Sequence, residues 1–249
     1  MSIESERDLL GLMKIGRVVG LALNEMRAAL KVGMTTYQLD AVGGAVFNQH
    51  GARSAPIITY QFPGQTCVSI DDEAAHGIPG QRVIQDGDLV KIDVSAELDG
   101  YYADAALTVP VGTISADKQN LIEGAQAALN AAIAAARDGQ PLNAIGKAAE
   151  TVSRRYRLQI VRELAGHGVG RGLHEEPRSV LNFYVPRVRQ PLHEGLVLAI
   201  EPHLTVGNGK VFTEENGWTI TTNDHKPVAN FEHTIVVTNG QPLIVTALP

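Results

Sequence analysis

Several features that would place a chain in a common class are missing from this sequence. Its 249 residues include one cysteine, Cys67, which excludes an internal disulfide framework and suits a reducing compartment. No apolar run approaches the ~18 residues of a membrane-spanning helix, and the charged N-terminal stretch lacks the apolar core of a signal peptide. Acidic side chains outnumber basic ones by 27 to 21, which argues against a dedicated nucleic-acid binder. We expect a cytoplasmic, soluble globular protein without nucleic-acid or membrane partners.

The motifs of several large enzyme classes are also missing. The sequence has no HExxH, no GxSxG, no Walker A loop and no complete GxGxxG. A glycine-rich stretch at 166–172 has a spacing that does not fit dinucleotide binding, and a lone cysteine excludes a cysteine-based zinc site. Any chemistry therefore rests on carboxylates and histidines.

The hydrophobic pattern predicts two pairs of helices, each followed by β-rich sequence. Apolar residues at helical spacing indicate a helix through the first thirty residues, which Gly33 stops. Thr35 or Thr36 then caps a second helix that ends near Gly51. The remaining segments are predicted as β-rich from 57 to 109, helical over 115–136 and 142–156, and β-rich to the end.

The repeated order suggests two related halves. When Gly33 is placed over Gly139, the apolar positions of the following helices coincide. The similarity is faint, so an internal duplication and a chance match of two amphipathic helices both remain open. We predict a single α+β domain over 1–249, with pseudo-symmetric halves of roughly 1–110 and 111–249 and helices packed on an antiparallel sheet.

Two aspartates are predicted to share one face of a β-hairpin. A tight Asp99–Gly100 turn would place Ser95 opposite Asp104, and Asp93 opposite Ala106. Asp93 and Asp104 then become diagonal neighbours within side-chain reach. Carboxylates held that close need a proton, a cation or solvent between them. The alternative is an ordinary solvated polar face.

Three further side chains stand in unusual β-rich contexts. His167 lies among glycines, Glu201 ends an apolar run, and Glu232 interrupts a strand-like run. Individually they could be a turn histidine and two edge-strand charges. Together with Asp93 and Asp104 they form a set of four carboxylates and one imidazole, which suits Mn, Fe, Co or Zn. The charge of the carboxylates matches two divalent cations, and a two-metal site with a bridging water favours hydrolysis.

Six motifs carry a resemblance that covers nearly the whole chain. They are AHGIP (75–79), KIDVSAELDGYYADAA (91–106), GHGVGRGLHEEP (166–177), AIEP (199–202), NGWTITTND (216–224) and FEHTIVVT (231–238). With them the sequence resembles the bacterial type I methionine aminopeptidases, which form subfamily A of the M24 peptidases. These belong to the pita-bread superfamily, which also contains Xaa-Pro peptidases and creatinase. The resemblance implies a pseudo-two-fold pita-bread fold with helices on a curved antiparallel sheet.

The resemblance also implies an activity and a ligand set. The enzyme would remove the N-terminal methionine from nascent proteins when the next residue is small. Asp93 would chelate one divalent ion, His167 and Glu201 a second, and Asp104 and Glu232 would bridge both. A water between the two ions, which could be Co, Mn, Fe or Zn, would attack the first peptide carbonyl, and Glu201 would handle its proton.

The same resemblance assigns residues to the substrate. His174 would contact the substrate backbone, and His76 would assist the tetrahedral intermediate and the leaving amine. Phe62, Cys67 and Trp218 would line the methionine pocket. The family is mostly monomeric, so we expect a monomer whose partners are nascent polypeptide N-termini.

This sequence departs from the family pattern around the pocket. Pro56 stands where cysteine is frequent, Thr59 where an aromatic residue is common, and Leu173 where phenylalanine is frequent, which predicts a wider pocket or a weaker methionine preference. Asp71 replaces a usual asparagine, which would disturb a peripheral cation site. The alternatives are a related pita-bread hydrolase of broader or Xaa-Pro specificity, and a non-catalytic metal-binding module.

Overall fold

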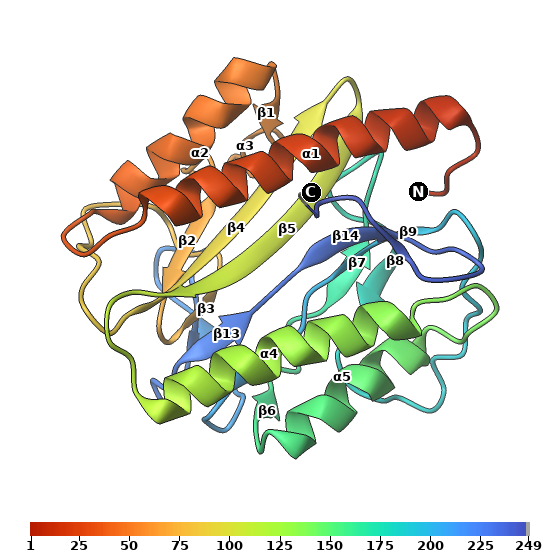
Figure 1. Ribbon diagram of the computed structural model, residues 1–249. Helices are drawn as coiled ribbons and strands as arrows, with labels where there is room; N and C mark the ends of the chain where they lie inside the picture. The colour runs from red at the N-terminus through yellow and green to blue at the C-terminus, as the bar shows by residue number, and fades with distance from the viewer. Residues whose placement is uncertain (248–249) are drawn as a thin grey trace.

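The computed structural model describes residues 1–247 and confirms the α+β class. Four long helices form two pairs, namely α1 (Glu6–Ala29) with α2 (Thr36–His50) and α4 (Ala116–Ala135) with α5 (Asn143–Arg155). In Figure 1 the two pairs lie on either side of the long central strands, which run between them. Across the described chain, no helix is both long and apolar enough to cross a membrane.

The strands are short except for two that form a long hairpin. In chain order they are β1 (Arg53–Ser54), β2 (Cys67–Ile70), β3 (Glu73–Ala75), β4 (Leu89–Leu98), β5 (Tyr101–Pro110), β6 (Gln159–Ile160), β7 (Gly166–Gly168), β8 (Glu175–Val180), β9 (Val197–Ile200), β10 (His203–Thr205), β11 (Val211–Thr213), β12 (Ile220–Thr222), β13 (Val228–Asn230), β14 (His233–Val236) and β15 (Leu243–Ile244). β4 pairs with β1, β2 and β5, and a second sheet has the order β15-β14-β9-β7-β8. Smaller sheets follow the orders β13-β10-β6 and β11-β12-β3. The strand pairs between these elements are antiparallel.

The predicted boundaries of α2 are confirmed by its caps. Thr35 forms a capping box with Gln38, which satisfies exposed backbone N–H groups at the helix start. Gly51 ends the helix in the left-handed conformation, at φ 67°. The helix predicted for the first thirty residues is confirmed over Glu6–Ala29, but Gly33 is not the residue that stops it. The helix stops at Ala29, because Leu30 is already extended, and Gly33 belongs to the connection, where its N–H donates to the Ile84 carbonyl.

The predicted β-rich start at residue 57 was also wrong, because Ala55–Tyr60 form the short helix α3. Ser54 accepts a hydrogen bond from the Ile57 N–H, and Pro56 sits in the first turn, where its missing N–H costs nothing. Gln61 ends the helix in the left-handed region, at φ 59°. These end signals override the β-branched composition of this segment.

The core joins both halves of the chain. α1 packs on β4 and β5, and α4 packs on β13 and β10. The largest buried apolar cluster contains Val90 and Ile92 of β4 together with Val197 of β9 and Val236 of β14. Strands from distant parts of the sequence are therefore fixed against one another, and the edges where they meet carry the polar side chains described next.

Candidate metal centre and its pocket

The β4–β5 hairpin places two aspartates as the sequence predicts. Asp99 and Gly100 have φ values of 53° and 81°, as a two-residue turn with two left-handed positions requires. Ser95 pairs with Asp104, and Asp93 with Ala106, so the predicted register is confirmed. Asp93 and Asp104 line the same cavity.

Glu232 joins them because the segment 230–234 runs beside β5. The backbone groups of Glu232 and Ala106 exchange two hydrogen bonds, of 2.9 and 3.3 Å. The Thr234 hydroxyl accepts from the Asp104 N–H at 2.9 Å and donates to the Asp104 carbonyl at 2.8 Å. Glu232 lies between β13 and β14 and is buried. These bonds hold two carboxylates that are far apart in the sequence, Asp104 and Glu232, beside each other.

His167 comes from the short strand β7, which lies between β8 and β9. A Cβ on Gly166 would lie 2.3 Å from the Ala199 carbonyl oxygen, and one on Gly168 would lie 2.3 Å from the Glu176 oxygen. The glycines on both sides of His167 therefore allow β7 to approach its two neighbours closely, as the glycine-rich motif suggests. Nδ1 of His167 donates to the Gly168 carbonyl at 3.0 Å, which leaves Nε2 with its lone pair free for a cation.

Glu201 follows the last residue of β9 and reaches the same point. Its backbone carbonyl accepts hydrogen bonds from Asn182 Nδ2 at 3.2 Å and from His203 Nδ1 at 3.0 Å. Nε2 of His167 lies 3.7 Å from Glu201 Oε1 and 3.7 Å from Asp104 Oδ2. Burial lowers the pKa of His167 to about 3, so the imidazole is neutral and these are not ion pairs.

Asp104 and Glu232 are buried and Asp93 and Glu201 are half-buried, and within residues 1–247 no lysine or arginine forms an ion pair with any of the four. Burial first, and the neighbouring carboxylates second, raise the pKa of Asp104 and Glu232 well above the ordinary carboxyl range. Burial likewise raises the pKa of Glu201 well above its usual value and that of Asp93 to about 6. Buried charges are normally paired or bound to a cation.

The donor set fits divalent metal. Asp104 Oδ1 and Glu232 Oε1 are buried and have no hydrogen-bond partner. Asp104, His167 and Glu232 each offer one ligand atom, and these three atoms lie within 4.8 Å of one another. Asp93 and Glu201 line the same cavity without belonging to that tight group. Carboxylate oxygens with a single imidazole suit hard and borderline cations such as Mn, Fe, Co and Zn.

An apolar pocket adjoins this cluster. The cavity has a volume of about 300 Å³, and its walls include Phe62, Cys67 and Trp218, the three residues predicted for the methionine pocket. Phe62 and Trp218 meet edge to face at a centroid distance of 5.2 Å. Pro56 and Leu173 also line the cavity. Thr59 does not line it, whereas its neighbour Tyr60 does.

Two histidines stand at the mouth of this cavity. His76 has a left-handed backbone, at φ 54°, directly after β3. Burial lowers the pKa of His76, and burial together with His76 lowers the pKa of His174. The ring of His174 lies over that of His167, with centroids 4.0 Å apart. Both imidazoles are therefore available as neutral donors or acceptors beside the carboxylate cluster.

Asp71, where the family usually has asparagine, lies in a turn that two lysines hold. Lys118 Nζ donates to Asp71 Oδ1 at 2.6 Å, and buried Lys91 Nζ donates to the Asp71 carbonyl at 2.8 Å. Lys91 Nζ also donates to the Val228 carbonyl at 3.2 Å. Burial lowers the pKa of Lys91 to about 8. The positive charges beside Asp71 are therefore the ammonium groups of Lys91 and Lys118.

Sequence reasoning missed two residues that line the cavity, Tyr60 and Ser95. Ser95 shares the alternating face of Asp93, so the strand pattern could have included it. Tyr60 carries no such signal, because its neighbour in the site, His174, lies 114 residues away.

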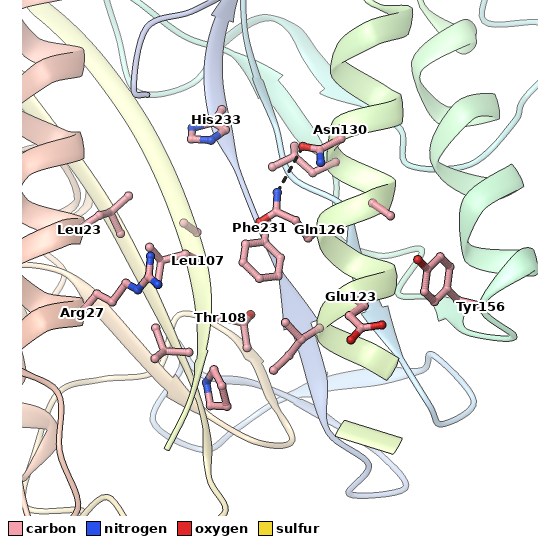
Figure 2. Close-up of a pocket in the computed structure, with 16 residues that line it drawn as sticks. Leu23, Arg27, Leu107, Thr108, Glu123, Gln126, Asn130, Tyr156, Phe231 and His233 are labelled. Atoms are coloured by element: carbon pink, nitrogen blue, oxygen red, sulfur yellow. Dashed lines mark hydrogen bonds between the residues drawn. The ribbon is translucent and has the colours of Figure 1, made fainter. Parts of the chain in front are cut away.

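A second cavity, larger at about 820 Å³, lies elsewhere. Figure 2 shows it between α1, which contributes Leu23 and Arg27, and α4, which contributes Gln126. Phe231 and His233 point into it. Because side chains alternate along an extended segment, Glu232 between them points the other way, toward the carboxylate cluster.

Comparison with known proteins identifies the family to which this chain is similar. Residues 11–239 match the sequence profile of metallopeptidase family M24. The chain is 41% identical over 249 residues to the methionine aminopeptidase of Staphylococcus epidermidis, with coverage of 100% of this chain and 99% of that protein.

Two solved structures share the fold. The crystal structure of methionine aminopeptidase from Thermotoga maritima superimposes with a TM-score of 0.96 at 32% identity, and each chain is covered completely. Prolidase from Pyrococcus furiosus superimposes with a TM-score of 0.79 at 20% identity, over 99% of this chain and 66% of that one. The second likeness concerns the fold alone. Together they confirm the predicted pita-bread fold.

Proposed function

This chain belongs to metallopeptidase family M24, and on that premise we propose that it is an aminopeptidase that removes N-terminal methionine from polypeptides. The observation that carries the proposal is the buried cluster of Asp104, His167 and Glu232 beside an apolar pocket. The pocket has room and soft, aromatic walls for an unbranched thioether side chain. Its substrates are nascent polypeptides whose second residue is small.

The donor set would hold two divalent ions when loaded. Asp93 would bind one ion, His167 and Glu201 the other, and Asp104 and Glu232 would be shared by both. The four carboxylates balance the charge of two such ions, and the unpartnered oxygens of Asp104 and Glu232 supply bridging positions. When bound, divalent ions activate a water and polarise the peptide carbonyl. Mn, Fe, Co and Zn all accept this ligand set.

The protein's own groups do the rest of the chemistry. Glu201, which lines the cavity with Asp104 and His167, accepts the proton of the attacking water. His174 hydrogen-bonds the substrate backbone near the scissile bond, and His76 stabilises the tetrahedral intermediate and the leaving amine. Phe62, Cys67 and Trp218 hold the methionine side chain.

We extend the proposal to the architecture and setting. The chain acts as one catalytic domain over 1–249, as a monomer in the cytoplasm, with halves of roughly 1–110 and 111–249. Gly33 and Gly139, which the proposed alignment superimposes, support the two halves because both have positive φ, 87° and 73°, and both precede the second helix of a pair.

The test is release of the first residue from matched peptides. Met-Ala-Ser is compared with Leu-Ala-Ser, and Met-Pro-Ser with Ala-Pro-Ser, first with chelator and then with Mn, Fe, Co or Zn restored. Metal-dependent cleavage confined to the methionine peptides supports the proposal. Cleavage of Leu-Ala-Ser or Ala-Pro-Ser as well would assign a broader or Xaa-Pro specificity. No cleavage with any metal would identify a non-catalytic module.

A further inference from the structure

Tyr60 forms a side-chain hydrogen bond with His174, a proposed catalytic residue that lines the same cavity. Its hydroxyl lies 2.7 Å from Nδ1 of His174, and the two rings are 5.6 Å apart at an interplanar angle of 57°. Both side chains line the cavity beside the carboxylates. Tyr60 belongs to α3, whereas His174 precedes β8, so the contact spans the pocket mouth.

The position of Tyr60 is fixed by its helix. α3 ends at Tyr60, because Gln61 turns into the left-handed region and its N–H donates to the Ile57 carbonyl. At the other end the Ser54 hydroxyl donates to the Gln65 carbonyl at 2.8 Å, and β1 pairs with β4. The phenol is therefore presented to His174 from a backbone anchored at both ends, although the side chain itself remains 45% exposed.

A hydrogen bond at Nδ1 selects the tautomer of a neutral imidazole. A neutral histidine carries its proton on one nitrogen and a lone pair on the other, so whichever nitrogen accepts leaves the other as the donor. A phenol hydroxyl donates readily to a nitrogen lone pair. With Tyr60 donating to Nδ1, the proton of His174 resides on Nε2, for which residues 1–247 provide no other hydrogen-bond partner.

We propose that Tyr60 is a positioning residue that holds His174 in the Nε2–H tautomer and in its orientation over His167, so that Nε2–H can donate to a peptide oxygen of the substrate. This inference rests on the proposed function for its catalytic consequence, whereas the tautomer is a property of the protein alone. A His174 proton on Nδ1 would leave a lone pair at Nε2, which cannot donate to a carbonyl.

The kinetic test uses Tyr60→Phe, which removes the hydroxyl and keeps the exposed ring. We expect kcat on Met-Ala-Ser to fall roughly 5- to 20-fold, as loss of one orienting hydrogen bond predicts, with KM changed less than about twofold. Tyr37→Phe, at an exposed tyrosine on α2, is the matched control and leaves both constants unchanged. In a His174→Ala background, Tyr60→Phe should have no further effect, because its action passes through His174. Equal losses in both backgrounds would overturn the proposal.

The second test needs no metal and no catalysis. Nitrogen chemical shifts of ¹⁵N-histidine protein, prepared metal-free at pH 8, report which ring nitrogen of His174 carries the proton, with His174→Ala providing the assignment. We expect a single Nε2–H tautomer in the wild type and a mixture in Tyr60→Phe. An Nδ1–H tautomer in the wild type, or an unchanged pattern in the variant, would overturn the inference. If this result holds while no methionine peptide is cleaved, the proposed function fails and the positioning role of Tyr60 stands.

Discussion

Two cavities share strand β5 and the segment 231–233 as a common wall, and they differ in the polar groups that line them. The groove between α1 and α4 is the larger, about 820 Å³ against about 300 Å³. Its walls are partly apolar and include the amides of Gln126 and Asn130, where Gln126 Nε2 donates to Asn130 Oδ1 at 3.3 Å (Figure 2). The smaller cavity contains Asp104 and Glu232 with unpartnered oxygens. The smaller cavity is therefore the candidate reaction site, because buried carboxylates without a partner indicate such a site better than cavity volume does.

The largest effect should come from the shared strand segment itself. Glu232→Ala removes a proposed bridge between two ions, and we expect kcat/KM on Met-Ala-Ser to fall at least about 100-fold. Mutation of residues that only hydrogen-bond to metal ligands already lowers activity or metal affinity by about 10- to 100-fold. Asp104→Ala should behave alike. Turnover and bound metal per chain are measured together. Near-normal turnover of either variant at limiting metal would contradict the two-metal mechanism.

A smaller loss is expected at the mouth of the site. His174→Ala removes a donor without removing a proposed ligand, so turnover should drop roughly 10- to 100-fold while metal content stays at the wild-type level. Elemental analysis of the purified variant measures whether its metal content is unchanged. Loss of metal would instead place His174 among the ligands.

The apolar wall of the small cavity should control affinity for the first side chain. Trp218→Ala removes the partner of Phe62, and we expect kcat/KM for methionine peptides to fall about 10-fold, mostly through KM. Phe212→Ala, at an exposed aromatic residue on β11, is the control. A loss confined to kcat would show that Trp218 serves the reacting bond rather than the side-chain pocket.

The difference in buried charge should also be visible in stability. A carboxyl whose folded pKa is raised lowers the stability of the fold at every pH above its unfolded pKa, which is 4.5 for glutamate. This cost grows with pH up to the folded pKa, and it is lost as the pH falls from the folded toward the unfolded pKa. Metal-free Glu232→Gln should therefore be more stable than metal-free wild type at pH 8, by ~1–4 kcal/mol, and the gain should shrink on acidification.

Urea unfolding with chelator at pH 8 and pH 6 measures this gain. Glu123→Gln, at an exposed carboxylate on the groove, should show no gain at either pH. A metal-free Glu232→Gln that is less stable than wild type at pH 8 would mean that the buried carboxylates are compensated within the protein.

The smallest effect is expected in the groove. Gln126→Ala alters its wall and touches no proposed ligand, so kcat/KM should stay within about twofold of wild type. A tenfold loss in the same peptide assay would show that the two cavities communicate through β5, and the comparison between them would no longer hold.

Local signals in the sequence predicted much of this structure. The Asp99–Gly100 turn set the hairpin register, and with it the shared face of Asp93 and Asp104. Thr35 and Gly51 marked both ends of α2. Each of these features depends on residues within a few positions of one another, which is the range over which turn and cap chemistry acts.

Features that depend on distant contacts were not predictable in this way. The segment Ala55–Tyr60 has β-branched composition, yet Ser54, Pro56 and Gln61 make it a helix. The bond between Tyr60 and His174 needs two elements that only the folded chain brings together. The family resemblance predicted that all five proposed ligands come together. The residue pattern alone did not, because each carboxylate could equally have been an ordinary charged side chain on the surface.

The joining of β5 to the segment 230–234 has a consequence for the timing of activity during synthesis. Thr234, whose hydroxyl ties this segment to Asp104, lies 130 residues further along the chain. At ~5–20 residues per second a ribosome takes roughly 7–26 s to span that interval. During that time the β4–β5 hairpin exists without Glu232, the second of the two carboxylates proposed to be shared by both ions. A newly made molecule would therefore become able to process other chains only after the segment that carries Glu232 and Thr234 has been synthesised.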